Sequence, residues 1–166
     1  TDIFDSQVYV YTPKGDLKSL PKGATSLDFA FSVHTQIGFK TRGTKVNGKL
    51  VPLSHVLKSG DQVEIITSEN TRPTANWIDY VTTSRAKTKI KSSLNDEKKL
   101  IAAEGKEMLK RKLKQLKITL NDKTVNELVS FLNLKTSLDL YYRAGLGNID
   151  NQKLKDYAAE SSNAFI

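Results

Sequence analysis

The fold is decided by residues 25–38, which read TSLDFAFSVHTQIG. Thr25 and Asp28 have the spacing of a capping box, in which each side chain bonds the other residue's backbone N–H. Apolar residues follow at helical spacing, and Gly38 is a typical helix stop. The stretch therefore predicts one helix of about three turns.

Strand patterns flank this helix on both sides. Apolar and tyrosine side chains alternate from Val8, and a turn at 13–16 leads into a second alternating run. After the helix, Asn47-Gly48 is the pair favoured in a type I′ hairpin, because both of its positions take positive φ. The strands are expected at 8–11, 17–20, 44–46, 50–51 and 63–67, with one helical turn at 53–57.

The order ββαβ(β)β within some sixty residues predicts an α+β fold. A single helix can cover only one face of such a sheet, so we expect a β-grasp arrangement with the other face in water. Function is then expected on the wet face or in the loops at the rim of the sheet.

A polar stretch at 68–76 separates this region from a second one, and Pro73 prevents a strand or helix from continuing through it. The apolar period beyond it is helical. Capping residues and glycines there predict short helices at 77–80, 84–94, 96–117, 124–132, 136–144 and 153–159. The predicted organisation is a tail at 1–7, a sheet domain at 8–67, a linker at 68–76 and a small all-α domain at 77–166.

The chain is basic, and its excess charge is local. It has 166 residues, of which 38% are hydrophobic and 27% charged, and its net charge is +8. Residues 85–117 alone hold 12 Lys and Arg against 4 Asp and Glu. This run is either a surface that attracts phosphate or the solvated face of a lysine-rich helix. No stretch is typical of a membrane span.

Motifs for catalysis or cofactors are missing or incomplete. Residues 43–49 fit the first seven positions of a phosphate loop, but Leu50 stands where a hydroxyl must bind magnesium. The chain has no Cys and only 2 His, neither of them at metal-ligand spacing. We therefore expect no catalytic residue, no metal and no cofactor, and interpret the chain as a binding module.

His34 is the first candidate for a binding residue. Its place on the apolar stripe fits a core histidine bonded to backbone, whereas its place just before Gly38 fits a surface imidazole that contacts a base or a phosphate. Lys40 and Arg42 follow directly and would attract a single-stranded nucleic acid. Trp77 is expected to pack the helical part against the sheet domain.

The motifs together resemble a known family. VYVYTPKGD (8–16), LPKGAT (20–25), LDFAF (27–31), HTQIG (34–38), KVNG (45–48) and GDQVEIIT (60–67) closely resemble the TGS domain. That domain is shared by threonyl-tRNA synthetases, certain GTPases and the RelA/SpoT stringent-response enzymes. YVTTSRAKTKI (80–90) and LDLYYRAGLG (138–147) resemble the segments that follow it in long RelA/SpoT proteins.

This resemblance implies a regulatory fragment of a guanosine tetra- or pentaphosphate synthetase/hydrolase, without catalysis of its own. It implies that His34 contacts the 3′ CCA end of uncharged tRNA, while Lys40 and Arg42 offset the charge of its backbone. The basic helical part, with Arg85, Lys87 and Lys89, would lie against ribosomal RNA. The alternative partners are acyl carrier protein or the enzyme's own catalytic domains. We expect a monomeric cytoplasmic fragment without membrane contact.

Overall fold

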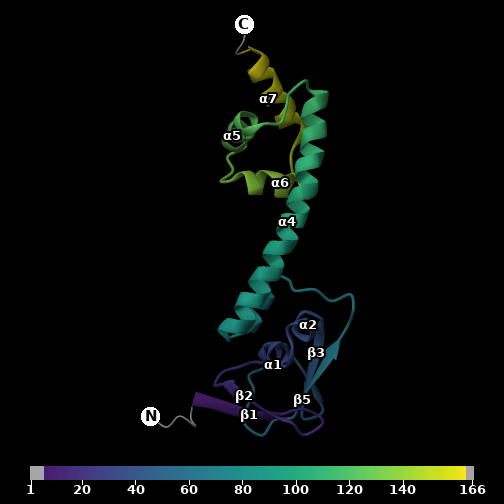
Figure 1. Ribbon diagram of the computed structural model, residues 1–166, viewed down its shortest axis with the longest axis vertical. Coiled ribbons are helices and arrows are strands. Elements are labelled where there is room, and N and C mark those ends of the chain that lie inside the picture. Colours follow the sequence, from purple (N-terminus) through teal and green to yellow (C-terminus); the bar gives the residue numbers. More distant parts are fainter. Residues whose placement is uncertain (1–5, 164–166) are drawn as a thin grey trace. The chain divides into compact units, whose positions relative to one another are not determined.

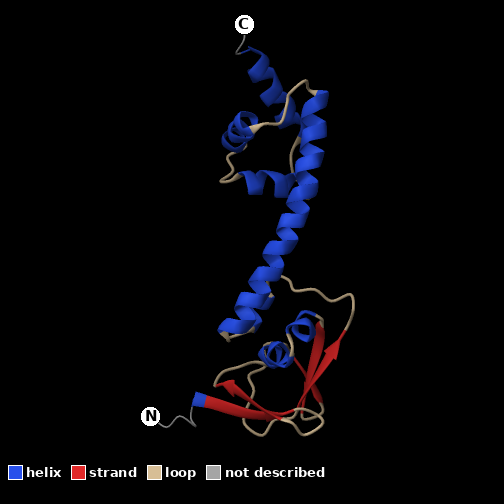
Figure 2. Cartoon of the chain, in the orientation of Figure 1, coloured by secondary structure: helices blue, strands red, loops and turns tan. Residues whose placement is uncertain are grey.

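The computed structural model describes residues 6–163, so residues 1–5 of the predicted tail lie outside the described part. The chain divides into two compact units, Thr1–Leu94 and Asn95–Ile166. Within residues 6–163, all strands belong to the first unit, as the red arrows of Figure 2 show. The described part contains no helix with the length and apolar character needed to cross a membrane.

The sheet of the first unit consists of two antiparallel ladders. β1 pairs with β2 so that Val8 lies opposite Leu20, and β3 pairs with β4 on one side and β5 on the other. A parallel bridge between Tyr11 and Gln62 joins the ladders. The strands are β1 (Gln7–Tyr11), β2 (Leu17–Pro21), β3 (Thr41–Val46), β4 (Lys49–Val51) and β5 (Val63–Thr67).

The capping box predicted at the start of the first helix is confirmed, with Thr25 and Asp28 bonding each other's backbone N–H. The prediction of one helix up to Gly38 is wrong. α1 (Ser26–Val33) ends at His34, which has extended backbone, and α2 (Thr35–Phe39) begins directly after it. The two helices lie on one face of the sheet (Figure 1), so the predicted α+β, β-grasp fold is confirmed.

The hairpin between β3 and β4 is also confirmed. Asn47 and Gly48 have φ values of 53° and 83°, the positive angles of a type I′ turn. The helical turn predicted at 53–57 is wrong: Leu53 and Ser54 form a tight turn, in which the His55 N–H donates to the Pro52 carbonyl, and the chain then runs along the start of α1. The backbone N–H of Leu27 donates to Leu53, and Thr25 forms a bridge with Val56.

Two apolar clusters build the first unit. One fills the space between the sheet and α1 and contains Val10, Phe29 and Val63. The other lies on the far side of α1, where Phe31 packs edge to face against Trp77 at 6.5 Å between ring centroids. Trp77 opens α3 (Trp77–Tyr80). Trp77 therefore packs against the helix that covers the sheet, and it belongs to the same compact unit.

The two helices predicted at 84–94 and 96–117 are one. α4 runs without interruption over Ser84–Gln115. Its early residues Ala86 and Ile90 belong to the cluster around Phe31, whereas Leu109 and Leu113 belong to the core of the second unit. The two units accordingly divide within α4, after Leu94, and not at the polar 68–76 stretch.

The second unit consists of helices around a leucine-rich core. Asn121 and Thr136 cap the helices that follow them, since each side chain accepts a backbone N–H of that helix. At Gly105 and Gly145, α4 and α6 approach so closely that a Cβ on either glycine would overlap backbone atoms of the other helix. The helices are α5 (Asp122–Phe131), α6 (Ser137–Gly145) and α7 (Asn151–Asn163).

Candidate functional site

His34 is exposed and held in place by a backbone contact. Its backbone ends α1 and its side chain caps α2, because the Gln36 backbone N–H donates to its Nδ1 at 3.0 Å. Since Nδ1 accepts, the proton of the neutral imidazole lies on Nε2. The interpretation of His34 as a core residue is therefore wrong. The ring is fixed at one nitrogen and can offer an N–H donor at the other.

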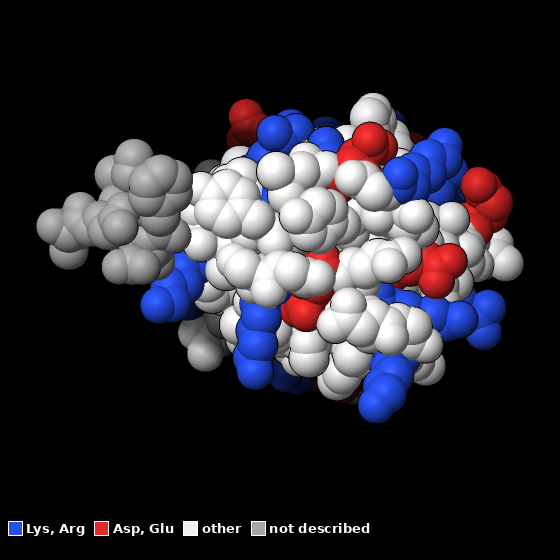
Figure 3. All heavy atoms as spheres, turned by 90° about the horizontal axis from the view of Figure 1, so that it is seen from below, with Lys and Arg blue, Asp and Glu red and all other residues white. Residues whose placement is uncertain are grey.

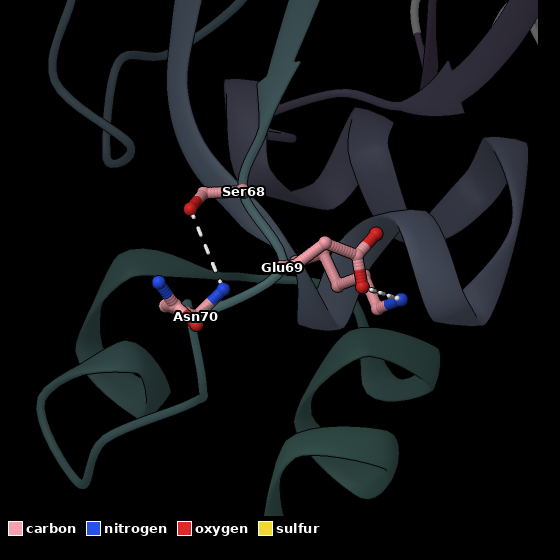
Figure 4. A network of polar contacts seen from close by, with 4 residues as sticks. Ser68, Glu69 and Asn70 are labelled. Atoms are coloured by element: carbon pink, nitrogen blue, oxygen red, sulfur yellow. Dashed lines mark hydrogen bonds and ion pairs between the residues drawn. The ribbon is translucent and has the colours of Figure 1, made fainter.

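Lys40 caps the opposite end of α2 and has an acidic partner. Its ammonium lies 2.9 Å from the carboxylate of Glu69, in the loop after β5. Figure 4 shows Glu69 between Ser68 and Asn70, with its carboxylate turned toward that ammonium group. His34 and Lys40 flank α2 and are separated by about 9 Å along its axis, given a rise of 1.5 Å per residue.

Arg42 lies on β3, two residues beyond Lys40, and is exposed. In the described part of the chain, no hydrogen bond or ion pair involves its side chain. The hydroxyl of Thr41 donates to the Ile37 carbonyl at 2.8 Å and so ties α2 to the start of β3. The structure therefore places His34 and Lys40 at the two ends of α2 and Arg42 on the strand that follows.

A hollow of about 500 Å³ lies beside α2. It is bounded by the turn after β1, by α1 and α2, and by β5. Val33 and Ile37, which flank His34 in the sequence, both contribute to its wall. The apolar part of the lining is Pro13, Phe29, Val33, Ile37, Val63 and Ile65. The charged lining residues are Lys14, Asp16 and Glu64, and His34, Lys40 and Arg42 are not among the lining residues. The apolar part of this wall suits the ring of a nucleobase.

The three basic candidates of α4 do not act as one group. Arg85 and Lys89 are exposed and share a helix face, since they are four residues apart. Lys87, which is half-buried, points to another side of the helix. No hydrogen bond or ion pair joins these residues to His34, Lys40 or Arg42 within residues 6–163.

Sequence reasoning did not identify the second role of Asp28, beyond the capping box. Its carboxylate is 2% exposed. It accepts the backbone N–H groups of Thr25, Thr82 and Thr83 and the Thr83 hydroxyl, at 2.7 to 3.1 Å. Asp28 thus fixes the segment before α4 to the start of α1. The bonds span more than fifty residues of sequence, so no local pattern could reveal them.

The charges of the first unit are mixed on the face drawn in Figure 3. Blue Lys and Arg side chains and red Asp and Glu side chains are interspersed among uncharged ones. This face therefore carries no continuous basic patch. At α2, the Lys40–Glu69 ion pair reduces the positive charge that Lys40 offers to a phosphate.

The second unit has a polar cluster of its own, between α4 and α6. Lys98 pairs with Asp139 at 3.3 Å and lies 5.2 Å from the centre of the Tyr142 ring. The hydrogen bond from Lys98 lowers the pKa of the Asp139 carboxyl below its ordinary value. Within residues 6–163, no group of three or more His, Asp and Glu side chains is arranged to hold a metal ion.

Comparison with known families gives two matches. The model of the TGS domain matches residues 8–67, and the model of the RelA/SpoT AH domain matches residues 95–155. The first matched range equals the predicted sheet domain. The second begins where the helical unit begins, at Asn95.

Full-length relatives match over both units. A GTP pyrophosphokinase of Myxococcus xanthus is 35% identical over 158 residues, which are 92% of this chain and 21% of that protein. A guanosine-3′,5′-bis(diphosphate) 3′-pyrophosphohydrolase of Aquifex aeolicus is 40% identical over 93% of this chain and 22% of that protein. A GTP pyrophosphokinase of Escherichia coli is 41% identical over 74% of this chain and 17% of that protein.

The chain thus spans about a fifth of the length of these relatives. The stated resemblance to the TGS domain and to the helical segments of long RelA/SpoT proteins is confirmed. The chain belongs to the RelA/SpoT family, of which it carries the TGS domain followed by the AH domain.

Proposed function

We propose that this chain is a regulatory, non-catalytic region that senses the 3′ CCA end of uncharged tRNA on the ribosome. The TGS unit reads the CCA end, and occupancy of that unit controls the catalytic part of the parent enzyme. The observation that carries the proposal is the exposed imidazole of His34, whose Nδ1 is engaged by the Gln36 N–H so that Nε2–H is left to donate.

The surroundings of His34 support a single-stranded RNA end as the ligand. Arg42 and, in part, Lys40 offset backbone charge along α2. The hollow lined by Val33 and Ile37 has room for a base that stacks on apolar atoms. Together these features supply the three contacts that a terminal nucleotide needs: a donor, a cation and an apolar wall.

The same arrangement explains how a charged tRNA would be rejected. A free terminal ribose offers hydroxyl groups that can accept the Nε2–H of His34. An aminoacyl ester adds bulk at that position and removes one hydroxyl. A site built around a hydrogen bond to a hydroxyl discriminates strongly against a ligand that lacks it, because its own donor is left unpaired.

Two variants of His34 separate its structural role from its binding role. His34→Asn keeps an acceptor for the Gln36 N–H, as an N-cap residue does, but has no donor at the position of Nε2. His34→Ala loses both. We expect His34→Asn to retain the stability of the chain and to reduce the preference for deacylated over aminoacylated tRNA by about fivefold.

The measurement is a titration of the chain with both tRNA forms over a series of salt concentrations. RNA binding should weaken steeply with salt. An unchanged preference in both His34 variants would contradict the proposed role of the imidazole. Tight, weakly salt-dependent binding of acyl carrier protein, with no measurable binding of tRNA, would instead favour a protein-interaction role for the same unit.

A further inference from the structure

A second hollow, of about 600 Å³, lies in the AH unit between α5 and α7. Its walls include two aromatic rings. Phe131 and Tyr157 meet edge to face at 5.7 Å between centroids and 61° between planes. Phe131 is 36% exposed although it is large and apolar. The hollow therefore presents aromatic surface to solvent.

The charges around this hollow have one sign. Glu127 and Glu160 line it, and none of its described lining residues is Lys, Arg or His. Both carboxylates belong to exposed residues. This contrasts with a chain whose net charge is +8. A phosphate backbone is repelled here, so the inference goes beyond the proposed RNA contact.

The helix ends at the hollow add to the negative potential. The carboxyl end of a helix carries a partial negative charge, which basic residues in the last turn usually offset. Neither α5 nor α7 has a basic residue in its last turn, and the last turn of α7 contains Glu160 instead. Departures from local rules of this kind are expected at functional or strained sites.

Glu127 is held at the hollow by a fixed donor. The Tyr157 hydroxyl donates to Glu127 Oε2 at 2.6 Å. Burial, and then this hydrogen bond, raises the pKa of the Tyr157 hydroxyl, so it stays protonated at neutral pH. Among the side chains that the structure describes, up to Ser161, none forms a hydrogen bond with the other carboxylate oxygen of Glu127. It remains available to an incoming donor.

We propose that this hollow binds an arginine side chain from a basic segment of a partner protein. A guanidinium stacks on an aromatic ring with its plane and donates to carboxylates with its edge. Phe131 offers the ring, and Glu127 and Glu160 offer the acceptors. The volume of about 600 Å³ exceeds what a single ammonium group fills, and it accommodates the residues next to the arginine.

The test uses the 166-residue chain labelled for NMR and a short blocked peptide with two arginines around a leucine. The control peptide carries citrulline, a neutral isostere, in place of each arginine. We expect the arginine peptide to shift the backbone signals of Ser130, Phe131 and Ser161, and to bind at least tenfold more tightly than the citrulline peptide.

A pair of double variants separates the site from general charge attraction. Glu127→Gln with Glu160→Gln should weaken the arginine peptide about tenfold. Glu97→Gln with Glu104→Gln changes the net charge equally at exposed positions of α4, and should weaken it less than twofold. The Tyr157 contact survives in the first pair, because a glutamine oxygen also accepts.

Three outcomes would overturn the assignment. The first is equal weakening by the two double variants, and the second is equal binding of the two peptides. The third is that spermidine binds more tightly than the arginine peptide and shifts the same NMR signals, those of Ser130, Phe131 and Ser161. That result would assign the hollow to a free polyamine. The tRNA titration of the His34 variants does not depend on any of these results.

Discussion

The TGS unit (residues 1–94) and the AH unit (residues 95–166) are each stabilised by a different kind of internal contact. In the TGS unit, the buried carboxylate of Asp28 accepts hydrogen bonds from backbone N–H groups that are distant in sequence, and the exposed imidazole of His34 caps the short helix α2. In the AH unit, helices approach through glycines over a leucine-rich core. The first unit depends on directional polar contacts and the second on close packing. Each therefore has its own most sensitive residue.

The strongest test of this contrast is Asp28→Ala in the TGS unit. The substitution leaves the buried N–H of Thr25 and the partly buried N–H groups of Thr82 and Thr83 without their acceptor. We expect a loss of about 4 kcal/mol in the free energy of unfolding, since each unpaired buried donor costs about 1 to 3 kcal/mol. The fluorescence of Trp77, which is the one tryptophan of the chain and is buried in this unit, reports the transition in urea.

The matched control is Asp16→Ala, which removes an exposed carboxylate from the turn after β1. Its effect should stay within about 0.5 kcal/mol. Equal losses in the two variants would show that net charge, and not the buried hydrogen bonds, determines the stability of this unit.

The corresponding test in the AH unit is Gly105→Ala. A methyl group there would overlap the Tyr141 carbonyl, so α4 and α6 must separate. We expect a loss of roughly 3 kcal/mol, at the upper end of the usual cost of overpacking. Far-UV circular dichroism should show the helical transition moving further than the Trp77 transition. Glu104→Ala, an exposed neighbour on α4, should change neither by more than about 0.5 kcal/mol.

Alkaline pH should lower the thermal stability of the AH unit more than that of the TGS unit, with a smaller effect than the two substitutions above. Burial raises the pKa of both Tyr141 and Tyr157 above the ordinary value of 10.0. The stability that these hydroxyls contribute is thus present below pH 10 and is lost as the pH rises through their folded-state pKa values. Thermal melts between neutral and alkaline pH should show the helical transition falling. Tyr157→Phe should cost about 1 kcal/mol at neutral pH and reduce the fall, and an unreduced fall would contradict this assignment.

The smallest effect is expected at the Lys40–Glu69 pair. Glu69→Gln removes an exposed negative charge and frees Lys40. We expect deacylated tRNA to bind about threefold more tightly at low salt, with no measurable change in stability. The gain should vanish at high salt. A gain that persists there would mean that Glu69 acts through the shape of its loop.

Local signals predicted most of the TGS unit. The capping box, the Asn47-Gly48 hairpin and the alternating strands are each written within a few residues. The break at His34 was not predictable in this way, because apolar spacing continues through it up to Ile37. The ends of α4 were predicted more closely than its continuity. Asp96, at which the sequence predicted a new helix, lies inside α4, which neither glycine nor proline interrupts there.

The candidate site was predictable only in part. His34, Lys40 and Arg42 lie close together in sequence, so their neighbourhood follows from the local fold. The ion pair of Lys40 and the hollow beside α2, however, depend on residues that are distant in sequence. Glu69 comes 29 residues after Lys40, and the wall of the hollow combines the turn after β1 with β5. Such contacts are a product of the tertiary fold and leave no periodic signal.

The position of His34 between two helices has one more consequence. The His34 side chain faces the solvent and also accepts a hydrogen bond from the backbone N–H of Gln36, in the first turn of α2. A ligand that binds the ring at Nε2 restricts rotation of the imidazole, and so protects the Gln36 amide from exchange with water. The hydrogen–deuterium exchange rate of one backbone position, two residues from the imidazole, thereby becomes an internal gauge of whether the ring is occupied.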